Sequence, residues 1–325
     1  MSQSSTALAA AAAARQSSTT KSAPRRRRRS GTPYVMLLPA LVLFAVFLAA
    51  PIVYTVYLSF QKLVVTGLGL GPGAQKQVWA GLANYANVLS DAAFLQSALR
   101  VLIYGVILVP SMLILALLFA LLLDSRRSRA RGFSRISIFL PYAVPAVISS
   151  LIWGFLYLPA VSPFYGLASV LGWKNPPQLL GGNLVILAVA NIALWGGVGF
   201  NMVIMYTALK AIPSELYEAA KLDGASDVQI ALRIKVPIIT PSLIMTAIFG
   251  MISTLQVFAE PTTLKPLSNA ISSTFTPLMT VYRDAFTRND IYSASAASVL
   301  IALATFILSF AFLRVIQRRA FSQEN

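Results

Sequence analysis

Side chains that could do acid–base or metal chemistry are scarce in this sequence, and many of them lie in one short stretch. The chain has no Cys and no His, and only ten Asp and Glu residues among 325. The usual nucleophile, general base and zinc ligands are therefore missing. Four of the ten carboxylates fall within residues 214–237, namely Glu215, Glu218, Asp223 and Asp227. We expect no enzyme and no metal site, and we expect this stretch to bind a partner.

Local signals in residues 214–237 predict two short helices joined by a tight turn. Ser214 is suited to cap the first helix, and two carboxylates then fall in the first turn, where the helix dipole favours anions. Gly224 is suited to the left-handed position that ends this helix. Residues 226–229 (Ser-Asp-Val-Gln) form a capping box that begins the second helix. Pro237 and Pro241 are expected to end it before the fifth apolar stretch.

The first of these helices has little side-chain bulk, so another backbone can come close to it. Its apolar face is too small to form a core, and a plain surface linker, the alternative, does not need two capped helices. We interpret the helix as a docking site for another protein. The residues expected to form this site are Glu215, Leu216, Glu218, Ala219, Ala220, Asp223 and Gly224. Glu218 is the expected polar contact, and Gly224 is expected to set the backbone geometry.

Composition places most of the remaining chain in a membrane. Hydrophobic residues make up 57% of the chain and charged residues 11%, with a mean hydropathy of +0.72, whereas soluble domains carry about 25% charged residues. Prolines in the apolar stretches need not break the spans, because neighbouring helices can satisfy the freed carbonyls. Aromatic residues near the ends, such as Tyr157, are expected at the membrane interface. Six stretches are long enough to cross about 30 Å of hydrocarbon: Tyr34–Phe60, Val101–Leu123, Ile136–Leu158, Leu184–Tyr206, Pro241–Phe258 and Ala294–Leu313.

The distribution of basic residues predicts the orientation of these spans. Nineteen of the 26 Lys and Arg residues lie in the N-terminal tail, the second and fourth connections and the C-terminus. By the positive-inside rule, both termini and the 213–237 loop are cytoplasmic. Topology thus accounts for the net charge of +16, and we do not expect nucleic-acid binding. The predicted domains are a disordered basic tail (1–33), a transmembrane domain (34–318) and a cytoplasmic C-terminal tail (319–325).

The 213–237 loop resembles the EAA signature of ABC-importer permeases. The matching residues are Glu218-Ala219-Ala220, Gly224 and the terminal Ile234-Lys235-Val236-Pro237, in which Val236 replaces the usual Leu. Further segments are similar to the carbohydrate-uptake branch of this family, so that the resemblance covers about residues 34–318. They are Gly81-Leu82-Ala83-Asn84-Tyr85 and Leu37-Leu38-Pro39-Ala40. The sequence departs from the branch at residues 259–265, where a Gly-Gly-Pro is usual.

The resemblance implies a type I ABC importer permease: an all-α, polytopic protein with six transmembrane helices and a cytoplasmic helix-turn-helix coupling loop. It implies a bacterial inner-membrane location and a heterodimer with a second, homologous permease, in which this chain is of the first-permease type. It also implies two cytoplasmic ATPase subunits and an extracytoplasmic solute-binding protein. The sequence contains no G-x-x-x-x-G-K-[ST], so ATP and Mg²⁺ are expected on the partner ATPase and no cofactor on this chain.

Three pairs of side chains are candidates for the solute path, because each pair shares one face of a predicted span. These pairs are Ser149 with Trp153, Asn191 with Trp195, and Ser253 with Gln256. Polar groups that merely bond across helices are the alternative.

The expected solute is a sugar or oligosaccharide, since the apolar spans contain no Arg or Lys for a phosphate. Glycerol-3-phosphate or a related phosphodiester is the alternative solute. An ion-coupled secondary transporter is a less favoured class, because the spans lack an acidic residue well inside them. An assembly protein is a third class.

Overall fold

The computed structural model describes residues 32–65, 75–125, 130–173 and 175–321. Most of the predicted tails, residues 1–31 and 322–325, lies outside this part of the chain. The described residues divide into two units, one up to Val53 and one from Tyr54 onward, which are treated separately below. In chain order, the elements are α2 (Thr32–Phe44), the π-turn η1 (Ala45–Ala49), α3 (Ala50–Ser59), β1 (Gln61–Val65), β2 (Gln75–Trp79), α4 (Ala83–Ser90), α5 (Ala92–Asp124), α6 (Arg131–Phe139), η2 (Leu140–Ala143), α7 (Ala146–Tyr157), α8 (Pro163–Val170), η3 (Gly182–Leu184), α9 (Val185–Lys210), α10 (Ser214–Leu222), α11 (Asp227–Ile230), the π-turn η4 (Ala231–Lys235), α12 (Val236–Ile238), α13 (Thr240–Leu255), α14 (Ala259–Leu264), η5 (Lys265–Leu267), α15 (Pro277–Tyr282), the π-turn η6 (Arg283–Thr287) and α16 (Ile291–Phe321).

The first unit contains α2, η1 and the beginning of α3. Pro39 lies inside α2 without interrupting it. Pro51 lies at the start of α3, directly after η1, where the Ala50 amide donates to the Ala45 carbonyl. A π-turn widens the helix just before the proline ring, which reduces its clash with the preceding turn. Helical structure therefore runs through Tyr34–Ser59, close to the predicted first span.

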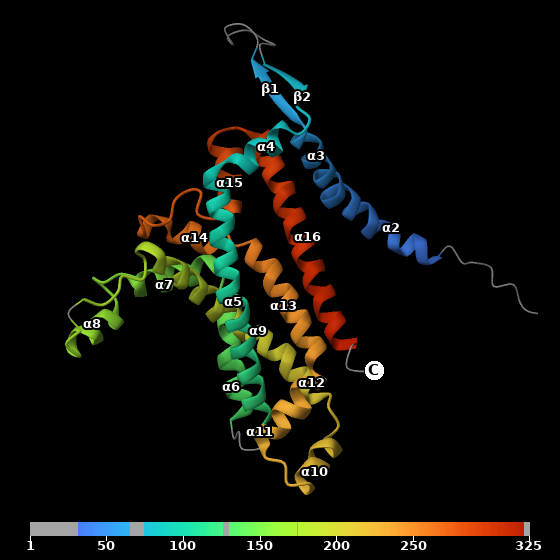
Figure 1. Ribbon diagram of the computed structural model, residues 1–325, viewed down its shortest axis with the longest axis vertical. Coiled ribbons are helices and arrows are strands. Elements are labelled where there is room, and N and C mark those ends of the chain that lie inside the picture. Colours follow the sequence, from blue (N-terminus) through green and yellow to red (C-terminus); the bar gives the residue numbers. More distant parts are fainter. Residues whose placement is uncertain (1–31, 66–74, 126–129, 174, 322–325) are drawn as a thin grey trace, which may run out of the picture. The chain divides into compact units, whose positions relative to one another are not determined.

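The second unit is a bundle in which α5, α13 and α16 run side by side and α9 packs along α5 (Figure 1). At the centre of the contact between α5 and α9, the small residues Ala116 and Ala120 are fully buried against Met202 and Met205. Small residues four positions apart let two helix backbones approach closely without a hydrophobic driving force. This contact is the core on which the other helices lie.

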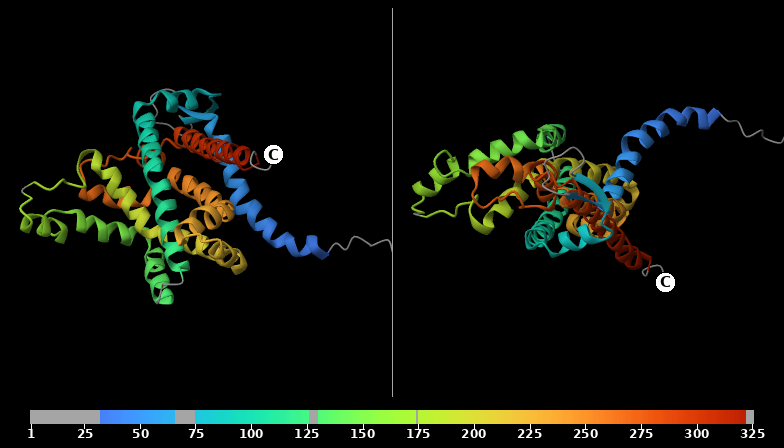
Figure 2. Two further views of the ribbon diagram at one scale, coloured as in Figure 1. Left: turned by 60° about the horizontal axis from the view of Figure 1, so that its bottom comes forward. Right: turned by 90° about the horizontal axis from the view of Figure 1, so that it is seen from above.

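Two helix pairs of the bundle are bent, and one of the bends lies inside a predicted span. Residues Arg131–Ala143 and Ala146–Tyr157 meet at 98° (Figure 2). Val144 is extended, with ψ 124°, because it precedes Pro145. Pro145 therefore lies at a bend of the predicted third span, whereas Pro110 lies inside the continuous helix α5.

The number of membrane-crossing helices depends on these bends. Among the described residues, four helices are long and apolar enough to cross a bilayer, and up to six if each bent pair is one span. The second bent pair, Asp227–Ile238 with Thr240–Leu255, turns by 68°. Every predicted span coincides with one of these six, so the mainly helical, polytopic class is confirmed and the count of six stays a prediction.

A two-stranded antiparallel hairpin, not predicted from the sequence, joins α3 to α4. β1 pairs with β2 from Gln61↔Trp79 to Val65↔Gln75. The buried amide of Asn84 donates to the carbonyls of Ser59 (2.8 Å) and Gln61 (2.7 Å). The segment Gly81–Tyr85, noted above only as a resemblance, therefore closes the base of the hairpin.

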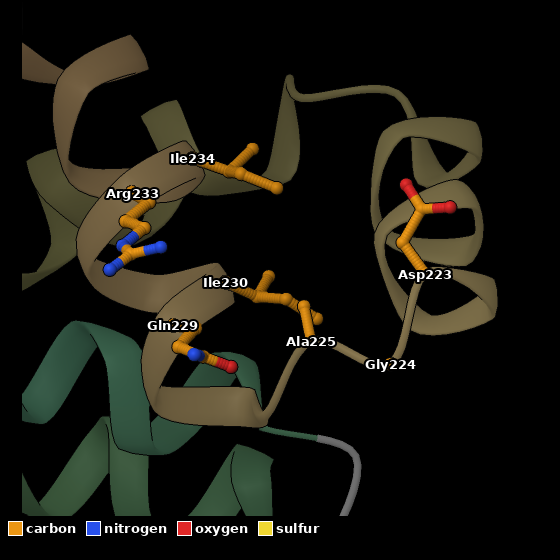
Figure 3. A pocket seen from close by; sticks show the side chains of 7 residues that line it. All are labelled: Asp223, Gly224, Ala225, Gln229, Ile230, Arg233 and Ile234. Atoms are coloured by element: carbon orange, nitrogen blue, oxygen red, sulfur yellow. The ribbon is translucent and has the colours of Figure 1, made fainter.

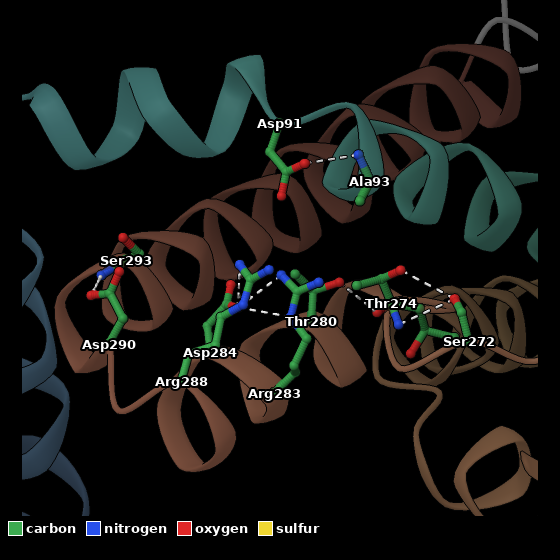
Figure 4. A network of polar contacts seen from close by, with 11 residues as sticks. Asp91, Ala93, Ser272, Thr274, Thr280, Arg283, Asp284, Arg288, Asp290 and Ser293 are labelled. Carbon is green, nitrogen blue, oxygen red and sulfur yellow. Dashed lines mark hydrogen bonds and ion pairs between the residues drawn. The ribbon is translucent and has the colours of Figure 1, made fainter.

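An ion cluster holds the segment before α16, at the end of the bundle away from α10 (Figures 1 and 4). Asp284 in η6 is buried and lies 2.7 Å from Arg283 and 3.4 Å from Arg288. Asp290 accepts from the Ser293 amide (3.0 Å) and so caps α16. Paired charges and a cap fix the start of this long helix.

We expect Asn84→Ala to destabilise the protein by about 1–3 kcal/mol, because two buried carbonyls lose their donor. Asn87→Ala, which removes an exposed amide from the same helix, should change stability by less than about 0.5 kcal/mol. Thermal unfolding in one detergent measures both variants. Equal effects of the two substitutions would contradict the proposed role of Asn84.

Candidate functional site

The first helix of the 213–237 loop, α10, ends in the turn that the sequence predicts. Gly224 is left-handed, with φ +80°. The Gly224 amide donates to the Lys221 carbonyl (3.0 Å) and the Ala225 amide to the Ala220 carbonyl (2.9 Å), which is a Schellman motif. The start differs from the prediction: Ser214 is the first helical residue and makes no side-chain cap. Glu215 still lies in the first turn.

The outward face of α10 is exposed and low in bulk. Glu215, Ala219 and Leu222 lie on this face, all exposed, and the Leu222 side chain is 90% exposed. Leu222 was not among the predicted docking residues, because the prediction rested on the small residues of this helix. Tyr217 and Ala220 are half-buried on the inward side, so Ala220 is not part of the exposed face.

A groove of about 410 Å³ separates the end of α10 from the next helical segment (Figure 3). Asp223 and Gly224 form one wall, and Gln229 and Arg233 the other. A capping box holds this second segment, with Ser226 N donating to Gln229 Oε1 (2.8 Å) and Gln229 N to Ser226 Oγ (3.3 Å). The prediction of a capped second helix is confirmed.

The second helix ends between the two predicted prolines, Pro237 and Pro241. It continues through η4 and α12 to Ile238, and the bend lies at the buried Ile239. In η4 the Val236 amide donates to the Ala231 carbonyl, five residues back. As at Pro51, a π-turn directly precedes the proline and lets the helix continue through it.

A buried carboxylate joins the loop to two membrane helices. Asp124, the last residue of α5, has a side chain only 6% exposed. Its oxygens lie 2.8 Å from Lys210 Nζ at the end of α9 and 2.5 Å from Lys235 Nζ in η4. Lys235 Nζ also lies 4.6 Å from the centroid of the Tyr217 ring. The role of Asp124 was not predicted, because its partners Lys210 and Lys235 lie 86 and 111 residues away in the sequence.

Three of the six predicted solute-path residues meet around Tyr157. The rings of Trp153 and Trp195 are 6.1 Å apart, edge to face, and Trp153 lies 5.6 Å from Tyr157. Asn191 Nδ2 donates to the Tyr157 hydroxyl (2.8 Å). Trp153 Nε1 is buried without a hydrogen-bond partner. Tyr157 is 3% exposed, so its predicted place at the membrane interface is wrong.

The other three predicted path residues lie apart from this aromatic cluster (Trp153, Tyr157, Asn191 and Trp195). Ser149 is buried and its hydroxyl donates to the Pro145 carbonyl (3.2 Å) within the first turn of α7. Ser253 and Gln256 are exposed at the end of α13. The spacing therefore identified residues on shared faces without identifying which faces meet.

The segment that departs from the carbohydrate-branch pattern forms the short helix α14. It packs against α7, and its Pro261 and Leu264 are buried. Glu260 lies in its first turn, and burial raises the pKa of the Glu260 carboxyl above its ordinary value. The departure thus replaces a flexible Gly-Gly-Pro with a packed helix.

Fold and site together define a helical membrane protein with a short exposed helix, α10, between two of its candidate membrane helices. Among the described residues, no three acidic side chains gather closely enough to hold a metal ion. Residues 78–322 match the protein family described as "Binding-protein-dependent transport system inner membrane component". The chain belongs to this family.

Relatives and a solved structure support the same fold and family. The chain is 30% identical over 292 residues to the sn-glycerol-3-phosphate transport system permease protein UgpA of Brucella abortus, covering 88% of this chain and 95% of UgpA. It is 32% identical over 226 residues to the trehalose/maltose transport system permease protein MalF of Thermococcus litoralis, covering 69% and 74%. A chain of a bacterial ABC transporter involved in the import of the acidic polysaccharide alginate has the same fold, with a TM-score of 0.76, 20% identity and coverage of 88% and 95%.

The family decides between the classes left open by the sequence. The chain is a component of binding-protein-dependent transport, and the less favoured ion-coupled carrier and assembly-protein classes are set aside. The resemblance to ABC-importer permeases and the type I permease fold are confirmed.

We expect Gly224→Ala to destabilise the turn after α10 by about 1–2 kcal/mol, because a Cβ disfavours the left-handed backbone. No atom lies within 4 Å of that Cβ, so the cost is conformational rather than steric. Hydrogen exchange of the α10 amides should accelerate about five- to thirtyfold. Gly132→Ala, at an equally open position in α6 with no positive φ, should leave α10 unchanged. Unaltered exchange in Gly224→Ala would contradict this account.

Proposed function

We propose that this chain is a permease subunit of a binding-protein-dependent ABC importer, and that α10 is the element through which a partner ATPase drives it. The observation that carries the proposal is the exposed outward face of α10 on a chain of this transport family. Glu215, Ala219 and Leu222 offer a charge, a close-approach point and an apolar anchor within two helical turns. A helix of this kind fits a groove on a partner protein.

ATP binding and hydrolysis belong, in this proposal, to a separate subunit. The chain then binds neither nucleotide nor Mg²⁺, and its contribution is to move. Dimerisation of two ATPase subunits would swing the helical bundle as a rigid body between two open states. A second permease completes the path, and a solute-binding protein delivers the solute. The solved alginate transporter was crystallised with a periplasmic protein bound to alginate pentasaccharide, which supports such an arrangement here.

The proposed orientation puts the 213–237 loop and both termini in the cytoplasm. The excess of Lys and Arg at these segments supports it. Two of these basic residues, Lys210 and Lys235, form ion pairs with Asp124. They therefore also stabilise the structure.

A sugar or oligosaccharide is the proposed solute. The aromatic cluster offers ring faces and an indole N–H without a partner, which suits stacking and hydrogen bonding to a sugar. MalF, one of the relatives, serves trehalose and maltose transport by name. The alternative, glycerol-3-phosphate, is favoured by the UgpA relatives, but the six apolar stretches predicted from the sequence contain no Arg or Lys for a phosphate.

Cells that lack this chain and carry it back on a plasmid test the proposal with radiolabelled maltose, trehalose and sn-glycerol-3-phosphate. We expect complementation to restore uptake of at least one of the two sugars and to leave glycerol-3-phosphate uptake unchanged. Deletion of residues 215–224 should abolish that uptake and the co-purification of the ATPase while the spans still insert. Ala219→Trp, a bulky side chain on the exposed face of α10, should lower uptake about tenfold or more, because a close approach is lost.

Val228→Trp is the matched control, since Val228 is exposed on the neighbouring helix α11 and should keep wild-type uptake. Restoration of glycerol-3-phosphate uptake alone would establish the alternative solute. Sugar uptake that survives the 215–224 deletion would refute the role of α10.

A further inference from the structure

The ends of two membrane helices and the docking loop meet at one carboxylate. Asp124 closes α5, Lys210 closes α9 and Lys235 belongs to η4, which leads into α13. These three elements are distant in sequence and share no turn or cap. The two ion pairs therefore tie together the ends of α5 and α9 and the segment that leads into α13.

The helix α10 reaches this cluster through Tyr217. A cavity of about 570 Å³ lies between α10 and the membrane-helix ends, and its wall includes Asp124, Tyr217 and Lys235. The Tyr217 ring packs against the buried cluster around Leu209 and Ile212 and lies under the Lys235 ammonium group at 4.6 Å. A cation is attracted to an aromatic face, and more strongly when water is excluded.

The chemistry of this contact makes it sensitive to the Asp124 charge. The Lys235 side chain is 15% exposed and lies between a carboxylate and a ring. Without the carboxylate, a nearly buried ammonium group would have only the ring, and it would move toward water. Burial, together with the nearby carboxylate, raises the pKa of the Tyr217 hydroxyl, so the ring stays neutral and keeps its place under the cation.

We propose that Asp124 is a positioning residue that makes α10 and the ends of α5 and α9 move as one body, so that displacement of the docking helix is transmitted to the membrane spans. This inference rests on the proposed docking of α10 to an ATPase. Lys235 and Tyr217 carry the displacement from α10 to Asp124, and Lys210 passes it to α9. Removal of the carboxylate leaves α10 able to bind its partner but free to move without the spans.

Distance measurements on the assembled importer test this inference. The chain contains no cysteine, so spin labels can be placed at Leu122, in the last turn of α5, and at Ser214, the exposed first residue of α10 outside the proposed docking residues, without altering other positions. The complex with its ATPase is studied in lipid nanodiscs, without nucleotide and after trapping with ATP and vanadate. The labelled wild-type complex must retain the ATPase on purification.

In the wild type we expect the distance between the labels to differ by less than about 2 Å between the two states, as in rigid-body motion. In Asp124→Asn it should shift or broaden by about 5 Å, roughly one helical turn, while ATPase co-purification is unchanged. Asp124→Glu, which keeps the charge, should restore the wild-type distances. Lys235→Gln should reproduce the Asp124→Asn result, and the double variant should be no worse than either.

Asp227→Asn is the matched control, because it removes a carboxylate from an exposed pair in the same loop, 3.4 Å from Lys221, where ion pairs contribute little. It should keep the wild-type distances. Wild-type distances in Asp124→Asn would overturn the inference while leaving the docking proposal intact. Loss of the ATPase from Asp124→Asn would also overturn it, since Asp124 would then support the docking surface itself. Failure of the wild-type chain to bind an ATPase would refute the proposed function first.

Discussion

A carboxylate almost excluded from water, between two ammonium groups, is the contact on which the proposed coupling of α10 to the membrane helices depends. A buried charge is stable only while it is paired, so Asp124 resists separation of Lys210 from Lys235. The apolar contact of α5 with α9 sets how closely these helices lie, because Ala116 and Ala120 leave no side chain to hold them apart. Packing thus fixes the distance, and the ion pairs fix which ends stay together.

The bends decide which helices meet inside this bundle. The 98° turn at Pro145 directs α7 toward α9, and Trp153 and Tyr157 then meet the side chains of α9. At Pro51 and Pro237 the outcome is the opposite, because a π-turn precedes each ring and the helix continues. Proline therefore lies at a bend in one place and inside a continuous helix in two others, depending on the turn that precedes it.

The sequence predicted what local chemistry determines. The Gly224 turn, the Ser226–Gln229 capping box and the positions of the six apolar stretches follow from nearest neighbours and from hydropathy. The hairpin was missed because its anchor, Asn84, acts on carbonyls across the turn between α3 and α4. Tyr157 was placed at the membrane interface because a span end is visible in the sequence, whereas its bond to Asn191 is not. The long-range partners of these polar residues could not be predicted, because no local sequence pattern contains them.

The central claim is that α10 is where an ATPase drives this chain, and a crosslinking scan tests it most directly. Single cysteines placed along residues 214–222 of the cysteine-free chain are crosslinked to the ATPase in the assembled importer. The account predicts a helical period of about 3.6 residues, with high yields at Glu215, Ala219 and Leu222 and low yields at Tyr217 and Ala220. Yields that are absent throughout α10, or that are highest on its inward side, would contradict it.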